Sequence, residues 1–544
     1  SEALRAGGEK GVAIFLDLRK AYDCVPHHAL ICKLRRNFPQ LPPYFLKFLF
    51  YWIRGHVRQL AVDGGTALDL NVARGLPQGS ILSPVCFNMF INDLVVLLRQ
   101  VLVGVSVDIP QIVGAAYQMI LKAMAFADDL LNLVRSLADA VRALRTCEDW
   151  AIENGLDFSP SKCNFMNIGC PWPGIRQWAL KIHNEQVSMC KEYKYLGVPF
   201  SSTRRASKWL KSDRFLEDIQ KELKKKFVIY DACHGCPLFV GHTIISLRFL
   251  PQLLYGAEVF QINPLAQGLN HQKLWGGLCK KVLGAYRTDS NVLALQFLGL
   301  RNMSDYRNKR IIKFCLKMLT CRYEFLWQPL EAVLNSTLPW MVDLRAEFLS
   351  ARQQGMFVVR DENAADPGQD LLADLDLDDF HGFLSDPVRF PTRGDMQAYI
   401  RKVMSAYDSN WERTKPQPHP AVQHAHIHGH IAFRFLSGRF NPRDNSTVYP
   451  CVLCEEPWAD NPGHLVRCEN AKVQAILLRG MEDCGIQQAD REEFLTTLAE
   501  PSAARCNNLL RLRPRKWDAF FRVMRNLWHV RTREWKRRYP HPGE

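Results

Sequence analysis

The sequence predicts an α+β protein, with an antiparallel sheet and its helices in the first 200 residues and a mainly helical chain after them. Three observations support this fold class. Apolar runs of strand length occupy residues 11–18 and 125–134. Apolar residues recur at helical spacing between residues 28 and 58 and again beyond residue 208. A composition of 47% hydrophobic and 23% charged residues is typical of a globular protein.

The first apolar run ends in the carboxylate of Asp17. An aspartate at the end of a buried strand is a poor structural choice, because its charge loses water, but it is a good metal ligand. Helix capping is the alternative for Asp17, and it is the interpretation that we favour for Asp23.

A glycine-containing loop follows the helical stretch and opens a new element. Gly75 and Gly79 permit close approach of the backbone, and a helix is expected to start at Ser80 or Ser83. A glycine loop that opens a helix is suited to hold a nucleotide, although alone it is a weak signal.

Asp128 and Asp129 stand between short apolar runs. The pattern predicts strand, tight turn and strand, with the two acids at the tip of a buried hairpin. Burying adjacent like charges costs several kcal/mol unless a cation lies near them, and a divalent metal is the usual cation. A surface turn is the alternative interpretation. A second pair, Asp378 and Asp379, lies in an aspartate-rich stretch that we interpret as solvated.

The chain has 70 basic and 55 acidic residues, a net charge of +15 and a pI near 9.1. This excess suggests a polyanionic partner, either nucleic acid or an anionic membrane surface. Membrane insertion is not expected, because the longest apolar runs are short or are interrupted by Lys47 or Arg99. No secretory signal is visible, and the 17 scattered cysteines favour a reducing compartment.

Three motifs then combine into one pattern: FLDLRKAYD at residues 15–23, GLPQGS at 75–80 and FADD at 126–129. In this order and at this spacing they resemble the reverse transcriptases of non-LTR retrotransposons, the long interspersed elements. Two further stretches are similar to the same family: DFSPSKC at 157–163 to its lysine-bearing segment after the catalytic hairpin, and YKYLGV at 193–198 to its primer-grip region.

The resemblance implies a right-hand polymerase palm and a helical thumb. It implies an RNA-directed DNA polymerase that extends a DNA primer on an RNA template with dNTP substrates, by target-primed reverse transcription. Two catalytic Mg²⁺ ions would be held by Asp17, Asp128 and Asp129, with the lesser direct role for Asp129. The expected partners include the rest of the element's polyprotein, and the expected location is a nuclear and cytoplasmic ribonucleoprotein.

The same resemblance implies roles at the nucleotide. Tyr22 matches a position whose ring crowds the sugar 2′ position and so favours deoxynucleotides. Gln78 and Gly79 match positions that contact the incoming nucleotide and the template. Lys162 matches a position near the triphosphate that can donate a proton; an exposed turn lysine is the alternative.

The family's fingers strands should precede Asp17 by many residues, and only sixteen residues do so here. We therefore expect the chain to be a piece of a longer polyprotein. We also expect this chain alone to extend a primer poorly or not at all. No endonuclease pattern is evident after Cys468.

Beyond the palm at residues 1–200, the sequence suggests four further segments. They are a helical thumb at 201–320, a helical connector at 321–360, an acidic linker at 361–390 and a C-terminal region at 391–544. An amphipathic stretch ending in three lysines at 224–226 supports the thumb, and the aspartate-rich composition supports a solvated linker.

Within residues 451–468, Cys451, Cys454, His464 and Cys468 have the spacing C-x2-C-x9-H-x3-C. Three thiolates and one imidazole form a closed tetrahedral set suited to structural Zn²⁺, and we predict a zinc knuckle. Five histidines between His419 and His430 lack interleaved cysteines, so we interpret them as one face of a strand or loop. His430 is an alternative zinc ligand.

The tail at 505–538 interleaves twelve Lys or Arg residues with aromatic residues. Trp517, Phe521, Met524 and Trp528 recur at helical spacing, so that side is expected to pack in a core, while the basic side faces RNA or DNA. Two other functions remain open: a group II intron-type maturase, and a decayed or domesticated RNA-binding protein that keeps only the polymerase fold.

Overall fold

The computed structural model divides into two compact units, one formed by residues 1–210, 321–346 and 375–393, the other by the remaining residues. The structure describes residues 4, 8–55, 58–60, 68–70, 73–109, 117–202, 221, 238–258, 271–285, 288–321, 336, 339–359, 368–375, 380–419, 422, 429–437, 450–454, 456, 461–501, 505 and 514–538. Several predictions from the sequence fall outside these residues: Lys224–Lys226, Asp378 and Asp379, and His424, His426 and His428.

The first unit is built around a five-stranded sheet. Its order is β11 (Ser188–Met189), β8 (Asn164–Gly169), β1 (Lys10–Asp17), β7 (Asp129–Val134) and β6 (Ala123–Phe126). Neighbouring strands are antiparallel except β11 and β8, which are parallel. The central strand β1 is a nearly continuous apolar run because both of its faces are buried. The predicted α+β class is confirmed.

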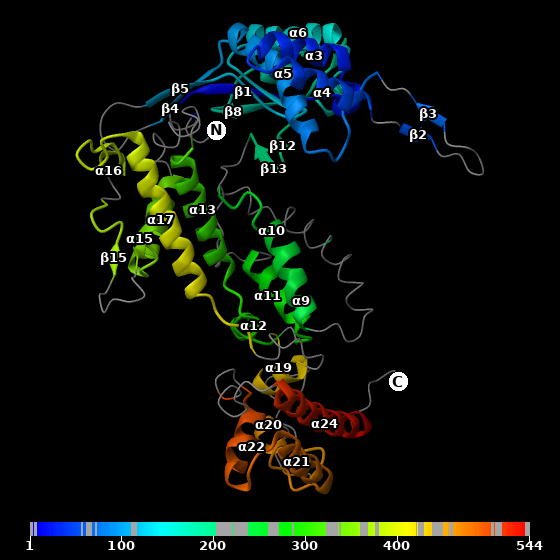
Figure 1. The fold of residues 1–544 in the computed structure, drawn as a ribbon, viewed down its shortest axis with the longest axis vertical. Helices are drawn as coiled ribbons and strands as arrows, with labels where there is room; N and C mark the ends of the chain where they lie inside the picture. Colours follow the sequence, from blue (N-terminus) through cyan, green and yellow to red (C-terminus); the bar gives the residue numbers. More distant parts are fainter. Residues whose placement is uncertain are drawn as a thin grey trace. The chain divides into compact units, whose positions relative to one another are not determined.

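Helices cover one face of this sheet (Figure 1). Val12, Ile14 and Leu16 of β1 point to this side and share one core with Phe87 and Ala143 of the helices. The helices are α3 (His27–Asn37), α4 (Pro43–Arg54), α5 (Leu82–Val101) and α6 (Leu137–Asn154).

Two hairpins cover the opposite face. They are formed by β4 (Val105–Ile109) with β5 (Tyr117–Leu121), and by β12 (Glu192–Tyr195) with β13 (Val198–Ser201). Here Ala13 and Phe15 of β1 pack with Val107 and Tyr195, and the ring centroids of Phe15 and Tyr193 are 4.1 Å apart. Burial on both faces holds the end of β1 rigidly, which suits a catalytic side chain.

Helix α6 shows how local sequence sets the ends of an element. The Ser136 side chain accepts a hydrogen bond from the backbone N–H of Asp139, and Gly155 ends the helix in the left-handed conformation. The buried Asp139 carboxylate in turn accepts hydrogen bonds from the backbone N–H groups of Val103 and Gly104. The start of α6 is thereby fixed to the start of β4.

Helix α5 is long and apolar enough, by length and composition alone, to cross a membrane. In the structure Phe87, Phe90 and Leu94 are fully buried in the core on the helical face of the sheet. The helix begins at Leu82, whose backbone N–H donates to Ser80 Oγ at 3.2 Å. One side of α5 therefore packs in this core.

The remaining elements of the first unit are short: α2 (Ala21–Cys24), β2 (Arg58–Leu60), β3 (Leu68–Leu70), the 3₁₀ turns η1 (Pro160–Lys162) and η2 (Ile175–Gln177), β9 (Lys181–Ile182), β10 (Glu185–Gln186) and α16 (Phe380–Ser385). Helix α15 (Pro339–Gln353) has residues in both units.

The second unit is mainly helical. Its elements up to residue 413 are α9 (Leu238–Ile244), the π-helical turn η3 (Ile245–Phe249), α10 (Leu250–Leu253), α11 (His271–Val282), α12 (Asn291–Leu298), α13 (Met303–Leu319), β14 (Val358–Val359), β15 (Gln369–Asp370) and α17 (Arg393–Arg413). Helices α13 and α17 lie side by side (Figure 1), joined by an ion pair of 2.8 Å between Lys313 and Asp408.

Part of the stretch expected to be a solvated acidic linker is folded. Leu371, Leu372 and Leu375 are buried, and Asp370 forms an ion pair of 3.1 Å with Arg352. The leucines that alternate with the aspartates supply apolar contacts that a count of charges overlooks. The expectation of solvation is therefore wrong at Leu371, Leu372 and Leu375, while Ala373 and Asp374 are exposed.

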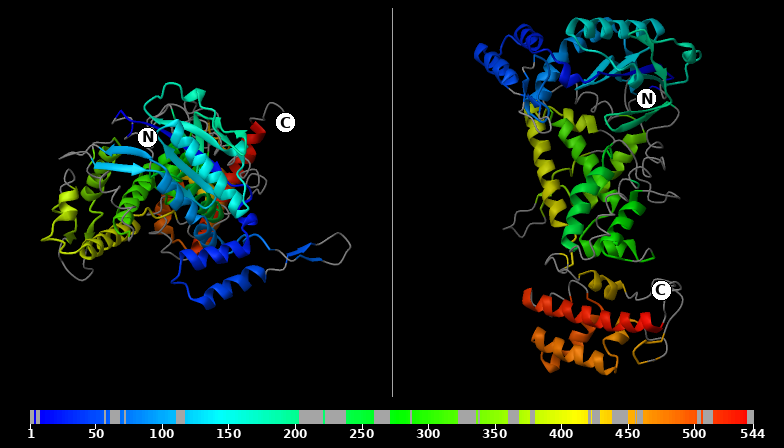
Figure 2. Two further views of the ribbon diagram at one scale, coloured as in Figure 1. Left: turned by 90° about the horizontal axis from the view of Figure 1, so that it is seen from above. Right: turned by 90° about the vertical axis from the view of Figure 1, so that its right-hand side faces the viewer.

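The C-terminal elements are α19 (Gly429–Ser437), α20 (Pro462–Leu465), α21 (Ala471–Cys484), η4 (Gln488–Asp490), α22 (Arg491–Ala499) and α24 (Pro514–Arg538). Figure 2 shows α24 lying across α21. Phe520, Phe521, Met524 and Leu527 are buried along one side of α24.

Candidate active site

Three carboxylates meet at one end of the central sheet. Asp17 is the last residue of β1 and lies directly opposite Asp129, the first residue of β7. Asp128 occupies the two-residue turn between β6 and β7, where Ala127 has a φ of 53°. A positive φ is usual in such a tight hairpin turn. The strand, turn and strand predicted around Asp128 are confirmed.

The hairpin is buried along only one of its strands. Residues 130–134 of β7 are buried, whereas Met124 and Phe126 of β6 are 41% and 65% exposed. Strand β6 is an edge strand of the sheet. Its hairpin partner β7 lies between β6 and β1. The prediction of a buried hairpin is wrong at residues 124–126 of β6, and the carboxylates lie beside an exposed edge strand.

Lys162 lies beside one of the carboxylates. Its Nζ is 3.1 Å from Asp17 Oδ2, while the Lys162 side chain is 66% exposed and that of Asp17 is 19% exposed. The segment that carries Lys162 is fixed to β1, because the backbone N–H of Ser159 donates to the carbonyl of Asp17. The lysine is therefore held at the site but remains accessible to a ligand.

The electrostatics of the site favour a cation. Burial raises the pKa of the Asp129 carboxyl, the Asp128 and Asp17 carboxylates raise it further, and Lys162 partly opposes them. The ionised form is thus destabilised by lost solvation and by like charges. Three carboxylates with one lysine leave a deficit of positive charge that suits Mg²⁺, which prefers oxygen ligands.

Tyr22 and the glycine loop flank the carboxylates. Burial raises the pKa of Tyr22, and the Asp128 carboxylate adds to the rise. The Tyr22 ring stacks on Phe87 with centroids 4.9 Å apart, which fixes its orientation. The backbone N–H of Leu76 donates to the carbonyl of Tyr22, so the loop is joined to this segment.

Gln78 and Asp23 contact each other, which the sequence did not predict. Gln78 Nε2 donates to Asp23 Oδ1 at 3.2 Å. Asp23 lies in the single turn of α2, whose N-cap residue is Lys20, so the interpretation of Asp23 as a helix cap is wrong. The cap prediction failed because the hydrogen-bond partner of Asp23 lies far along the chain.

Gly79 leaves open space beside the loop. Its φ is 85°, a conformation that favours glycine, and no atom lies within 4 Å of where a Cβ would stand. The backbone at Gly79 is therefore accessible to a ligand.

Two tyrosines near the carboxylates were not singled out as site residues. The hydroxyl of Tyr193 donates to the carbonyl of Lys162 at 3.4 Å, and that of Tyr195 to the carbonyl of Asp129 at 3.5 Å. Burial, with Asp129 as the next cause, raises the pKa of both hydroxyls to about 12. The sequence contained a signal for this pair, because Tyr193 and Tyr195 are two residues apart and side chains with this spacing share one face of a strand.

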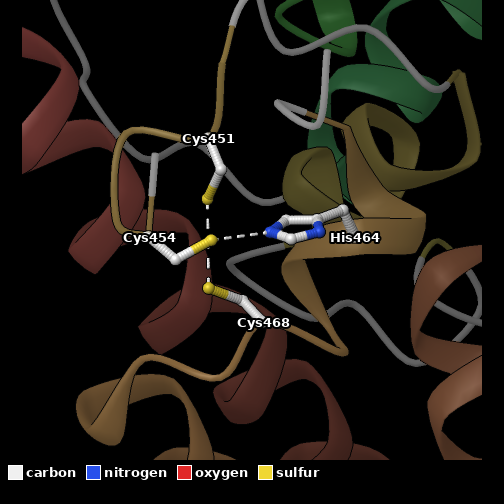
Figure 3. A group of neighbouring side chains, drawn as sticks. All are labelled: Cys451, Cys454, His464 and Cys468. Carbon is white, nitrogen blue, oxygen red and sulfur yellow. Dashed lines mark hydrogen bonds between the residues drawn. The ribbon is translucent and has the colours of Figure 1, made fainter. Parts of the chain in front are cut away.

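A second cluster lies in the C-terminal region. The ligand atoms of Cys451, Cys454, His464 and Cys468 all lie within 4.8 Å of one another, and the four side chains converge (Figure 3). Cys451 Sγ is 3.9 Å from Cys468 Sγ, and Cys454 Sγ is 3.2 Å from His464 Nε2. Ligands about 2.3 Å from a shared tetrahedral Zn²⁺ lie roughly 3.8 Å apart, which this cluster matches.

The surroundings of the cysteine cluster fix it locally. The Asn461 side chain caps α20 by accepting from the backbone N–H of His464, and Asn470 Nδ2 donates to the carbonyl of Leu453. Burial, followed by a hydrogen bond with Cys454, raises the pKa of Cys468 to about 12. Thiolates at such a site need a cation.

His419 is a core residue. Its ring stacks on Phe297 at 4.3 Å and its Nε2 hydrogen-bonds to the carbonyl of Pro501. Burial lowers the pKa of His419 to about 4. The side chain of His430 lies outside the described residues.

Comparison with known proteins identifies the class of the first unit. Residues 1–200 match the model of the family "Reverse transcriptase (RNA-dependent DNA polymerase)". Residues 1–200 are therefore similar to reverse transcriptase domains.

Curated relatives narrow the class. The chain is 27% identical over 263 residues to the Pol polyprotein of the type-1 retrotransposable element R2 of Popillia japonica, covering 47% of this chain and 39% of that protein. It is 24% identical over 265 residues to the RNA-directed DNA polymerase of the mobile element jockey of Drosophila melanogaster, covering 47% of this chain and 26% of that protein. It is 30% identical over 309 residues to a probable RNA-directed DNA polymerase of the X-element of the same fly, covering 56% of this chain and 31% of that protein.

The chain thus spans less than half the length of these relatives. The resemblance to the reverse transcriptases of non-LTR retrotransposons is confirmed.

Proposed function

We propose that this chain carries the catalytic residues of the RNA-directed DNA polymerase of a non-LTR retrotransposon, an enzyme that extends a DNA primer on an RNA template. The observation that carries the proposal is the pairing of Asp17 with Asp129, beside Asp128, inside a reverse transcriptase domain. The domain supplies the expected chemistry, and the carboxylates supply the ligands.

The proposed cofactor is a pair of Mg²⁺ ions held by Asp17 and Asp128, with Asp129 completing the set. The raised pKa of Asp129 fits such a cofactor, because a nearby cation would relieve the repulsion among the three carboxylates. When bound, such ions would favour ionisation of the primer 3′ hydroxyl and would stabilise the charge on the transferring phosphate.

The side chains around the carboxylates have separate proposed tasks. Lys162 leaves Asp17 to contact the triphosphate and donates a proton to the leaving pyrophosphate. The Tyr22 ring, held by Phe87, excludes a 2′ hydroxyl, while Gln78 and Gly79 contact the nucleotide and the template. The contact with Asp23 orients the Gln78 amide before the substrate binds.

We also propose the finer organisation: a polymerase palm at residues 1–200, a helical thumb at 201–320 and a zinc knuckle at 451–468. Support for the knuckle comes from the convergence of three sulfur atoms and one imidazole nitrogen. The exposed Arg522, Arg533, Lys536 and Arg537 of α24 support a phosphate-binding role for the tail, because its apolar side is already buried.

A protein that only binds RNA is the second candidate function, favoured by the net charge of +15. The two functions differ in one measurement. Asp128→Asn removes a charge from the carboxylate cluster and should leave RNA binding intact. Under the polymerase proposal it abolishes extension of an annealed DNA primer by dNTPs with Mg²⁺.

A readout that does not need turnover makes the test decisive for this chain. Fe²⁺ bound in place of Mg²⁺ should cleave the backbone near residues 17 and 128 when peroxide and ascorbate are added. Asp17→Asn and Asp128→Asn should abolish these cuts, whereas the matched double variant Asp378→Asn/Asp379→Asn should keep them. Cuts that persist in the Asp128→Asn variant would contradict the metal assignment.

A further inference from the structure

The solvent side of α4 has an unusual composition. Tyr44, Phe48 and Tyr51 are 76%, 54% and 63% exposed, whereas Leu46 and Ile53 on the other side are buried in the core. An ordinary surface helix turns charged and polar residues to water. We call Tyr44, Phe48 and Tyr51, with Lys47 and Arg54, the ring face.

The three rings form a row. At about 100° per residue, Tyr44, Phe48 and Tyr51 fall within roughly 60° of one another around the helix. Along the axis they are separated by about 6 and 4.5 Å, more than the roughly 3.4 Å between stacked bases of one strand. The row therefore offers each base of an extended strand its own ring.

Cations lie along one side of this row. Lys47 and Arg54 lie about 60° and 80° from Tyr44 on the same side of the helix. Both are exposed, and among the described residues neither forms an ion pair. The Arg54 guanidinium lies 5.1 Å from the centroid of the Phe50 ring.

A groove continues the ring face toward α3. It has a volume of about 630 Å³ and is lined by Arg35 of α3, by Lys47 and by apolar residues that include Ile31, Leu46 and Phe50. Residues 24–62 contain no aspartate or glutamate, so every charged side chain on α3 and α4 is basic. The groove and the ring face are thus complementary to a polyanion.

We infer that the ring face and the adjoining groove bind single-stranded RNA, with bases stacked on the rings and phosphates on the cations. The identity of the strand rests on the proposed function, since an RNA-directed polymerase must hold template RNA that is not yet paired. A lipid surface or an apolar protein partner fits less well. The leucines and the isoleucine of α4 are buried, and apart from Pro43 at its first position the exposed side chains of α4 are rings and cations.

The test measures binding of a fluorescein-labelled 20-nucleotide poly(U) RNA to the whole chain, with EDTA present and without dNTPs. The triple variant Tyr44→Leu/Phe48→Leu/Tyr51→Leu keeps apolar area but removes the rings, and we expect its affinity to fall at least about tenfold. The ring-retaining variant Tyr44→Phe/Phe48→Tyr/Tyr51→Phe should bind like the wild type.

Salt dependence tests the cations separately. The slope of log K against log salt is negative, and each lost phosphate contact reduces its magnitude by about 0.7 for a single strand. Lys47→Ala/Arg54→Ala should therefore reduce the magnitude of the slope by about 1.4. The matched control Arg142→Ala/Arg145→Ala removes two exposed arginines from α6 and should leave the slope unchanged.

An unchanged RNA affinity of the leucine variant would overturn the inference. So would a leucine variant that loses only self-association, measured by sedimentation, or only its binding to phosphatidylserine vesicles. The Asp128→Asn variant should bind this RNA normally. Absence of the Fe²⁺-dependent cuts near residues 17 and 128, with ring-dependent RNA binding, would therefore refute the proposed function alone. Ring-independent RNA binding with carboxylate-dependent cuts would refute this inference alone.

Discussion

The carboxylate cluster and the cysteine cluster are assembled over very different lengths of chain. Asp17 and Asp129 come from distant segments and meet only because β1 and β7 pair in one register. The four side chains of the cysteine cluster all lie within residues 451–468. The carboxylate site is held by a sheet that is buried on both faces, whereas the cysteine site is held by short turns and one capped helical turn.

The comparison teaches how a metal and its surroundings depend on each other. A site on a packed scaffold keeps its shape without the metal, at the cost of repulsion among its charges. A site made of turns depends on the metal for its shape, because its ligands are otherwise joined by few buried contacts. The predictions below test this difference.

Removal of zinc should have the largest effect on folding, and this effect should be confined to the C-terminal region. Binding of structural zinc contributes about 10–16 kcal/mol in small zinc-finger peptides, so chelation or Cys454→Ser should unfold the segment around residues 450–470. Hydrogen exchange measures the loss of protection there and its retention in β1. Cys32→Ser, at an exposed cysteine of the first unit, is the control. Equal protection with and without zinc would refute a structural metal.

Substitution at the carboxylates should leave the fold intact and remove the chemistry. In the longer polyprotein that we expect to contain this chain, Asp128→Asn should lower the rate of primer extension by about 10³-fold or more, with a smaller loss for Asp129→Asn. Both variants should melt at or above the wild-type temperature without metal, because each removes a repulsive charge from the cluster. A large drop in melting temperature would show that these carboxylates serve the fold instead.

Acid should weaken the second unit through His419. Its pKa is about 4 in the folded chain and near 6.5 when unfolded, so the unfolded chain takes up a proton first as the pH falls. The neutral His419 side chain contributes fully to the free energy of unfolding above about pH 6.5. This contribution is lost as the pH falls toward about 4, and the loss is on the order of 3 kcal/mol in total.

His419→Phe keeps the stacking on Phe297 and should remove this part of the pH dependence. Urea unfolding at pH 7.5 and 5.0 measures it. Burial also lowers the pKa of His271 to about 4, and that residue remains in the variant. The test therefore compares the loss of unfolding free energy between pH 7.5 and 5.0 in the variant with the loss in the wild type. An equal loss in the two proteins would contradict the role of His419.

Tyr22 should have the smallest effect, limited to selectivity. Tyr22→Ala opens space beside the sugar and should raise incorporation of ribonucleotides relative to deoxynucleotides by about tenfold to a hundredfold. Tyr22→Phe keeps the ring on Phe87 and should keep the discrimination. Competition between rNTP and dNTP in primer extension gives the ratio, and an unchanged ratio in the alanine variant would remove Tyr22 from this role.

The sequence by itself determined the elements whose cause is local. The apolar run of β1, the hairpin that carries Asp128, the Ser136 cap of α6 and the spacing of the cysteine cluster can all be read within a few residues. The resemblance to a family could also be read from the sequence, because the three motifs that carry it are short and ordered. Local hydrogen bonds and side-chain periodicity are enough to specify such features.

Only the tertiary structure decided which residues meet. The contact of Gln78 with Asp23, the placement of Tyr195 under Asp129 and the exposure of β6 depend on the pairing of distant segments. The burial of Leu371 and Leu372 within an acidic stretch and the exposed rings of α4 also depend on what packs against each element. A periodic pattern shows that a helix or strand has an apolar side, but it does not show which neighbour covers that side or which side stays open to a ligand.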